Sequence, residues 1–146
     1  MSIATDDHLL DTADALNALL RNELAAVDAY TRAIGLFNDP AVIEQLQSIR
    51  DAHRRAVREL RDGVIRGHGE PAAGGGVWDG FAPASAGKAV GGAAVLAALR
   101  RGEEYAVGAY EDALSSADLA RRTGTDLLAA SRGHVDELNR LLGGAG

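Results

Sequence analysis

The chain has 146 residues, is 47% hydrophobic and 25% charged, and carries a formal net charge of −6 at pH 7. This length and composition predict one domain, covering residues 1–146, with enough apolar side chains for a buried core. The absence of cysteine excludes disulfides, thiolate metal sites and a thiol nucleophile, and the acidic charge argues against nucleic acid, whose binding needs a basic surface.

Helical periodicity predicts a first helix over residues 9–37, with N-cap candidates at Thr5–Asp7. Asp39 is a good N-cap and Pro40 suits the first helical position, so a second helix is predicted over residues 40–66. Gly67 follows as the stop signal. Because only a short turn separates two long helices, they are expected to form an antiparallel hairpin.

A long connection, residues 67–92, follows this hairpin and contains glycine and alanine runs. Trp78 and Phe81 lie within it and are interpreted as pinning the connection to the bundle. The alternative is an exposed hydrophobic patch for a partner. The simplest reason for a connection of this length is a crossover from one helical hairpin to the next.

A second hairpin is predicted from helices over residues 93–114 and 119–142, with caps in the segment 115–118 and a stop at Gly143. Gly124 and Gly133 lie inside the last helix, and each costs about 1 kcal/mol relative to alanine. The start of this helix is therefore the least secure of the four and could instead be Thr125.

Four ionisable residues interrupt the apolar stripes of these helices: Glu23, His53, Glu103 and His134. The other members of the first stripe are apolar or aromatic, namely Leu16, Leu20, Val27, Tyr30, Ile34 and Phe37. A charged group on the apolar stripe of a helix costs several kcal/mol of folding free energy unless it is paired, neutralised or bound to a metal. These four residues are therefore the strongest functional signal in the sequence.

The two halves of the chain repeat each other, because Glu103 and Tyr110 reproduce the spacing of Glu23 and Tyr30. In an antiparallel hairpin, residues at equal distance from the turn lie at the same height. Glu23 and His53 satisfy this condition closely, and Glu103 and His134 satisfy it more loosely. Both pairs fall near the middle of helices of this length. All four side chains are therefore expected to converge, whichever way the second hairpin points.

These Glu, Tyr and His residues, on helices spanning almost the whole chain, resemble the ferritin-like superfamily of four-helix bundles, in particular a largely uncharacterised bacterial branch built from two such hairpins. The resemblance implies an all-α bundle of two antiparallel hairpins joined by a long crossover. Di-iron members carry a Glu-x-x-His on two of their helices. Here Arg50 and Ser131 stand three residues before His53 and His134, so the full di-iron ligand set is lacking.

Two interpretations of the cluster stay open. Glu23, His53, Glu103 and His134 could bind a single divalent metal, Fe, Mn or Zn, in a stress-related or metal-handling role. They could instead form a buried, metal-free network of acid–imidazole pairs in a structural or interaction module. Tyr30 and Tyr110 are interpreted as core residues with bonded hydroxyls. No organic cofactor is predicted.

Other features of the chain give weaker expectations. Nothing in the sequence shows the open coordination position of a redox enzyme, so no catalytic residue is assigned. No signal peptide and no apolar run of membrane-spanning length is found, which predicts a cytoplasmic protein without a membrane partner. A homo-oligomer is compatible with a bundle of this size, although no exposed stripe requires one.

Overall fold

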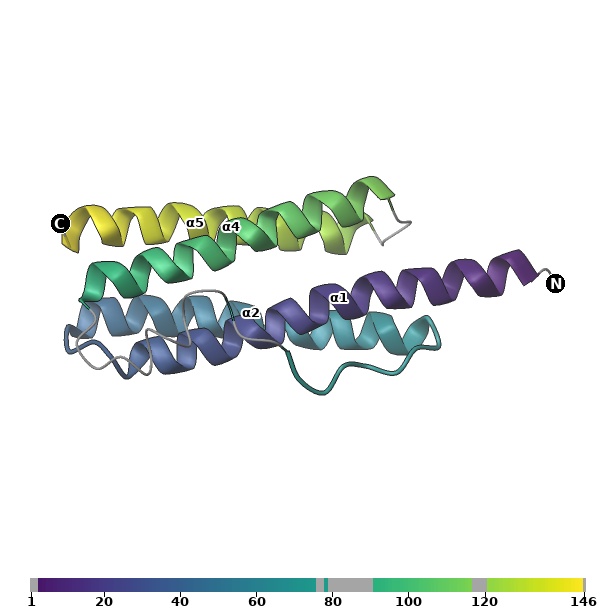
Figure 1. Cartoon of the computed structure of the whole chain (residues 1–146), viewed down its shortest axis with the longest axis horizontal. Coiled ribbons are helices and arrows are strands. Elements are labelled where there is room, and N and C mark those ends of the chain that lie inside the picture. Colours follow the sequence, from purple (N-terminus) through teal and green to yellow (C-terminus); the bar gives the residue numbers. More distant parts are fainter. Residues whose placement is uncertain (1–2, 76–77, 79–90, 117–120, 146) are drawn as a thin grey trace.

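The computed structural model describes residues 3–75, 78, 91–116 and 121–145. Its helices are α1 (Ile3–Ile34), α2 (Pro40–Arg66), α4 (Gly92–Ser116) and α5 (Arg121–Ala145), and no strand occurs among the described residues. Helices α1 and α2 form one antiparallel hairpin, and α4 and α5 form the other (Figure 1). The predicted all-α architecture of two hairpins is confirmed.

The second hairpin is oriented so that its first helix, α4, follows the direction of α2 (Figure 1). Helices α2 and α4 run the same way along the bundle, so the connection between them must return over its length (Figure 1). Helix α1 packs against α2 and α4, while α5 packs against α4 and α2. In the described parts of α1 and α5, and likewise of α2 and α4, the backbones stay farther apart than 8 Å between Cα atoms. These two pairs therefore occupy the diagonals of the bundle.

Helix α2 begins and ends where its sequence signals predict. The side chain of Asp39 accepts a hydrogen bond from the backbone N–H of Ala41 at 3.0 Å, and Pro40 occupies the first turn. At the other end, the backbone N–H of Gly67 donates to the carbonyl of Gly63 at 3.0 Å. Both ends of the helix thus have partners for backbone groups that helix geometry leaves unpaired.

Helix α1 differs from its predicted range at both ends. It already includes Thr5–Asp7, so these residues are not its caps, because the stretch before them contains nothing that breaks a helix. It ends at Ile34, where the N–H groups of Gly35 and Leu36 turn back to carbonyls three residues earlier. Glycine favours this early stop. Phe37 lies beyond the helix and still packs against the core.

The helices of the second hairpin extend beyond their predicted ranges at both ends of α4 and at the end of α5. Helix α4 begins one residue early and continues through Ser116, so Ser115 and Ser116 do not cap the next helix. The described part of helix α5 already runs from Arg121, so the alternative start at Thr125 is wrong, and the helix includes Gly124 and Gly133. The predicted start at residue 119 and the cap candidates at 117–118 lie outside the described residues. It continues to Ala145, so the predicted stop at Gly143 is wrong.

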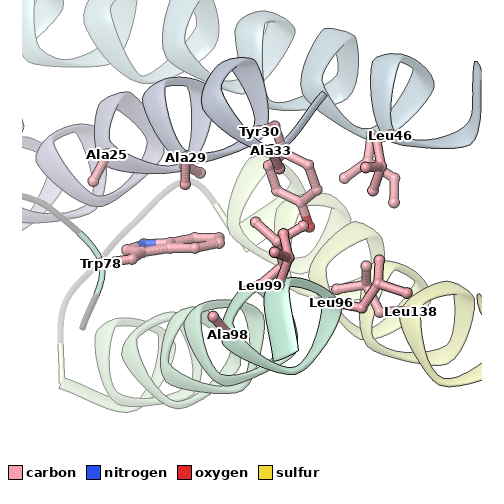
Figure 2. Close-up of a cluster of buried hydrophobic side chains, with 13 residues drawn as sticks. Ala25, Ala29, Tyr30, Ala33, Leu46, Trp78, Leu96, Ala98, Leu99 and Leu138 are labelled. Atoms are coloured by element: carbon pink, nitrogen blue, oxygen red, sulfur yellow. The ribbon is translucent and has the colours of Figure 1, made fainter. Parts of the chain in front are cut away.

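Two apolar clusters fill the bundle, and each contains one tyrosine. The first includes Tyr30, Leu46, Leu96, Leu99 and Leu138, together with Trp78 (Figure 2). The second lies toward the other end and includes Leu16, Leu20, Leu60, Tyr110 and Leu127. Glu23, His53 and Glu103 are buried but belong to neither cluster. They form a polar layer at mid-bundle height between two apolar halves.

Trp78 anchors the crossover between α1 and α4, with Ala25 and Ala29 on one side and Ala98 on the other (Figure 2). Its indole is 95% buried, and its Nε1–H donates to Asn22 Oδ1 at 3.0 Å. The prediction that Trp78 pins the connection to the bundle is therefore confirmed. Phe81 lies outside the described residues.

Upstream of Trp78, the crossover lies directly on the backbone of α1. Asn17 accepts a hydrogen bond from the N–H of Ala72 at 2.9 Å and donates one to the carbonyl of Glu70 at 2.8 Å. A Cβ atom at Gly75 would lie 2.1 Å from the carbonyl oxygen of Arg21. Only glycine permits this close approach. Residues 70–75 of the crossover are thus held against α1 by the side chain of Asn17 and by the close approach of Gly75.

Replacing Gly102 by alanine is expected to displace Trp78, because the added Cβ would lie 2.0 Å from Trp78 Cε3. We expect a red-shifted emission from this single tryptophan and a loss of about 1–3 kcal/mol in the free energy of unfolding. Gly108→Ala, on the same helix with nothing within 4 Å of the new Cβ, is the matched control. The control should be neutral or stabilising by up to about 1 kcal/mol. Unchanged emission in Gly102→Ala would contradict this packing.

Candidate functional site

The centre of the polar layer is an imidazole between two carboxylates. Helix α2 places His53 opposite Glu23 of its own hairpin and Glu103 of the other hairpin. His53 Nδ1 lies 2.5 Å from Glu23 Oε1, and His53 Nε2 lies 2.7 Å from Glu103 Oε2. All three side chains are at least 98% buried. Each of these two short nitrogen–oxygen contacts requires a proton between its atoms, and two such protons make His53 an imidazolium when both glutamates are ionised.

Two tyrosine hydroxyls bind the same carboxylates from the opposite hairpins. Tyr30 of α1 donates to Glu103 Oε2 of α4 at 2.6 Å, and Tyr110 of α4 donates to Glu23 Oε2 of α1 at 2.5 Å. The predicted bonded hydroxyls are therefore confirmed. Each tyrosine therefore joins the two hairpins. The two hydrogen bonds are equivalent under the internal repeat, which relates Tyr30 to Tyr110 and Glu103 to Glu23.

His134 lies at the edge of this network and makes only a loose contact with it. Its Nδ1 is 3.4 Å from Glu103 Oε2 and makes no hydrogen bond, although the atom is buried. The rings of His53 and His134 have centroids 4.8 Å apart. Glu103 Oε1 is also buried without a partner. One oxygen of Glu103 and one ring nitrogen of His134 are therefore buried without a hydrogen-bond partner beside the central ion pair.

The charges of the layer support each other strongly. Burial opposes the charge of His53, but the negative charges of Glu103 and Glu23 overcome it and raise the pKa of His53 from 6.5 to about 10. Burial also opposes the charge of Glu103, but the charge of His53 lowers the pKa of Glu103 from 4.5 to about 2. At neutral pH His53 is thus an imidazolium held between two carboxylates.

The tyrosines keep their protons under these conditions. Burial, followed by the nearby charge of Glu103, raises the pKa of Tyr30 above its ordinary value. Burial and the charge of Glu23 do the same for Tyr110. Both hydroxyls therefore act as donors to carboxylates and not as bases.

The structure brings all four predicted residues together at one height. Atoms of His53, Glu103 and His134 that could ligate a metal lie within 4.8 Å of one another. Glu23 is placed differently, because one of its oxygens is bonded to His53 and the other to Tyr110. It contacts the imidazole from the side opposite Glu103.

The two positions that depart from the di-iron pattern lie at different depths. Ser131 is 98% buried on the inner side of α5. Arg50 is mostly buried, with Nε 3.7 Å from Asp51, which is itself exposed at the surface. Its positive charge is therefore directed toward a surface acid, and no contact joins it to the carboxylates of the layer among the described residues.

Trp78 is a neighbour of the site that sequence reasoning did not connect with it. Its ring centroid lies 6.0 Å from that of Tyr30 and 6.2 Å from that of His53, in edge-on arrangements. The indole therefore covers the polar layer on the α1–α4 side. In the sequence, Trp78 was notable only as the single tryptophan of the crossover. That does not predict which residues it contacts.

Tyr30→Phe and Tyr110→Phe are each expected to lower the free energy of unfolding by about 1.5–3 kcal/mol, because each removes a hydrogen bond to a buried charged group. Chemical denaturation of metal-free protein measures this loss. Tyr105→Phe is the control, since Tyr105 is 69% exposed. Equal effects at Tyr105 and Tyr30 would show that the hydroxyl bonds contribute nothing.

The fold and the site together define a ferritin-like four-helix bundle with a Glu/His group at its centre. A crystal structure described as that of "ferritin like, diiron-carboxylate proteins from Bacillus anthracis str. Ames" matches with a TM-score of 0.77 and 17% identity. The match covers 97% of this chain and 99% of that chain. The likeness establishes the ferritin-like fold, which confirms the expected class.

Residues 11–116 match the family described as "Domain of unknown function (DUF2383)", and the chain belongs to this family. The comparison with curated proteins finds no match. Among the described residues, no helix combines the length and the apolar character needed to cross a membrane.

Proposed function

We propose that this protein binds one divalent metal ion, Fe, Mn or Zn, through His53, Glu103 and His134, in a metal-handling or stress-related role. The observation that carries the proposal is the pair of buried, unpartnered atoms Glu103 Oε1 and His134 Nδ1 beside His53. Two imidazoles and one carboxylate are a donor set typical of mononuclear non-haem iron and of zinc sites.

Distances and charges are compatible with such an ion. Ligand atoms about 2.1 Å from a tetrahedral metal lie about 3.4 Å from each other. His134 Nδ1 lies 3.4 Å from Glu103 Oε2, the oxygen that already binds Tyr30 and His53. His53 Nε2 and Glu103 Oε2, at 2.7 Å, share a proton and would have to separate slightly for an ion to enter, while Glu103 Oε1 is free to bind it. A divalent ion replacing that proton would balance the two carboxylates of the layer, which a single imidazolium does not.

The surrounding residues would prepare the ligands. Glu23 holds Nδ1 of His53 and so directs Nε2 toward Glu103, as carboxylates commonly do for metal-binding histidines. Tyr30 fixes one oxygen of Glu103 and leaves the other free. Trp78 excludes water from the α1–α4 side. A bound metal would supply Lewis acidity and, for Fe or Mn, one-electron redox capacity. The neighbouring structure's description as a diiron-carboxylate protein is consistent with this class of chemistry.

A second candidate is a metal-free module in which the layer joins the two hairpins. It is favoured by the fact that both nitrogens of His53, both oxygens of Glu23 and both tyrosine hydroxyls already have partners. In this case the network specifies how the hairpins pair, as buried polar groups do in some bundles. Metal content distinguishes the two candidates.

Purified protein should contain one Fe, Mn or Zn ion per chain by plasma emission spectrometry. In titrations of metal-free protein, Co²⁺ should quench the fluorescence of Trp78, which lies 6.2 Å from the ring of His53. Glu103→Gln should weaken metal binding more than about 100-fold, because even loss of a residue behind a ligand costs 10–100-fold. Affinity should rise with pH below about 10, since the ion must displace the proton of His53.

Glu104→Gln is the matched control, because Glu104 is the exposed neighbour of Glu103 on the same helix. It should bind metal like the unaltered protein. Substoichiometric metal and no saturable Co²⁺ response in the unaltered protein would overturn the metal-binding proposal and favour the metal-free module.

A further inference from the structure

A groove of about 910 Å³ lies between α1 and α4, and Trp78 forms part of its wall. Its apolar lining is made largely of small side chains, including Ala15, Ala18, Ala25, Ala109 and Ala113. Two helices that face each other through alanines leave space that larger residues would fill. The exposed ring of Tyr105 also borders the groove. The groove therefore offers flat aromatic and small apolar surfaces to a ligand.

The charged residues that line this groove are Arg21, Arg101 and Glu104. Arg21 and Arg101 line the groove from α1 and α4, on opposite sides. Each stands two positions before the Glu of its repeat, and because the two helices are antiparallel the arginines differ in height by about 6 Å. Neither arginine has an ion-pair partner among the described residues. The groove thus has a local positive excess in a chain whose net charge is −6.

Asn22 supplies an independent observation at the inner end of the groove. Its Oδ1 accepts the Trp78 Nε1–H bond, which fixes the orientation of the amide and leaves Nδ2 as a donor. Nδ2 is buried and has no partner, and Asn22 lines the groove. A buried donor without an acceptor is unfavourable. An anionic ligand would supply that acceptor.

We infer that the groove is a binding site for a small organic anion with a flat apolar body, held by Arg21, Arg101 and Asn22 Nδ2 and stacked near Trp78 and Tyr105. Guanidinium and amide donors recognise carboxylate and phosphate oxygens alike. The volume lies within the range of small-molecule sites. This volume favours a small ligand over a second copy of the chain, which needs a far larger contact surface.

The inference is independent of the proposed metal site, so its test uses chelator-treated, metal-free protein. Benzoate, phenyl phosphate and the neutral benzyl alcohol are titrated while the fluorescence of Trp78 and the oligomeric state by light scattering are recorded. At least one of the two anions should give a saturable change, at least tenfold tighter than benzyl alcohol, with the protein remaining the same size. Which anion binds more tightly identifies a carboxylate or a phosphate ligand.

The double variant Arg21→Gln/Arg101→Gln should weaken binding of the preferred anion at least tenfold. The control Arg54→Gln/Arg58→Gln removes the same charge from the exposed face of α2 and should change affinity less than twofold. Asn22→Asp, which can still accept the Trp78 bond but adds a negative charge, should also weaken binding. No saturable response, equal binding of benzyl alcohol, equal losses in both double variants, or a response explained by self-association would overturn the inference.

Discussion

Glu103→Gln is expected to lower the free energy of unfolding by about 3–5 kcal/mol at pH 7, the usual cost of removing one partner from a buried ion pair. Glu103 is fully buried and contacts both His53 and Tyr30. Glutamine keeps the size of the side chain but removes the charge that balances the imidazolium. For a domain of 5–15 kcal/mol total stability this loss is large. Urea denaturation of metal-free protein measures it.

Glu104→Gln again provides the control, with an expected change within about 0.5 kcal/mol, because the side chain is exposed. A second background makes the test sharper. In His53→Gln protein, Glu23 and Glu103 would be two buried carboxylates without the imidazolium between them. There the same Glu103→Gln change should stabilise the fold. An equal loss in both backgrounds would mean that Glu103 does not act through the charge of His53.

Much of the site could be predicted because the height of each side chain along the bundle depends only on how many residues separate it from the turn. Helical rise fixes how far Glu23 and His53 lie from their turn, and turn signals such as Asp39 and Pro40 are local. The sequence therefore predicted the helices, the hairpins and the convergence of four residues. Predicted helix ends were less accurate, because Gly35 stops α1 early while Gly143 does not stop α5.

The pairing of atoms could not be predicted in this way. Tyr30 reaches Glu103 of the other hairpin, and its partner depends on how the two hairpins pack side by side, which distance from the turn does not specify. The repeat also suggests equivalent histidines, yet His53 bridges the carboxylates and His134 lies beside them. Only one imidazole fits between two carboxylates, so a symmetric sequence gives an asymmetric site.

The stability of the metal-free protein should be greatest between about pH 4.5 and 6.5. Folding raises the pKa of His53 from 6.5 to about 10, so the stability this group contributes is complete below 6.5 and is lost as pH rises through 10. Folding lowers the pKa of Glu103 from 4.5 to about 2, so its contribution is complete above 4.5 and is lost as pH falls toward 2. Because the two shifts describe one ion pair, they must not be added.

Between pH 6.5 and 10, the folded state holds one proton more than the unfolded state at His53. The free energy of unfolding should therefore fall by about 1.4 kcal/mol per pH unit in this range, and by several kcal/mol in total. Urea titrations at a series of pH values, with a chelator present, measure this slope. His53→Gln removes the titrating group, so subtracting its profile cancels the contributions of groups elsewhere in the chain. If the two profiles run parallel from pH 6.5 to 9, His53 is not the imidazolium that joins the two hairpins.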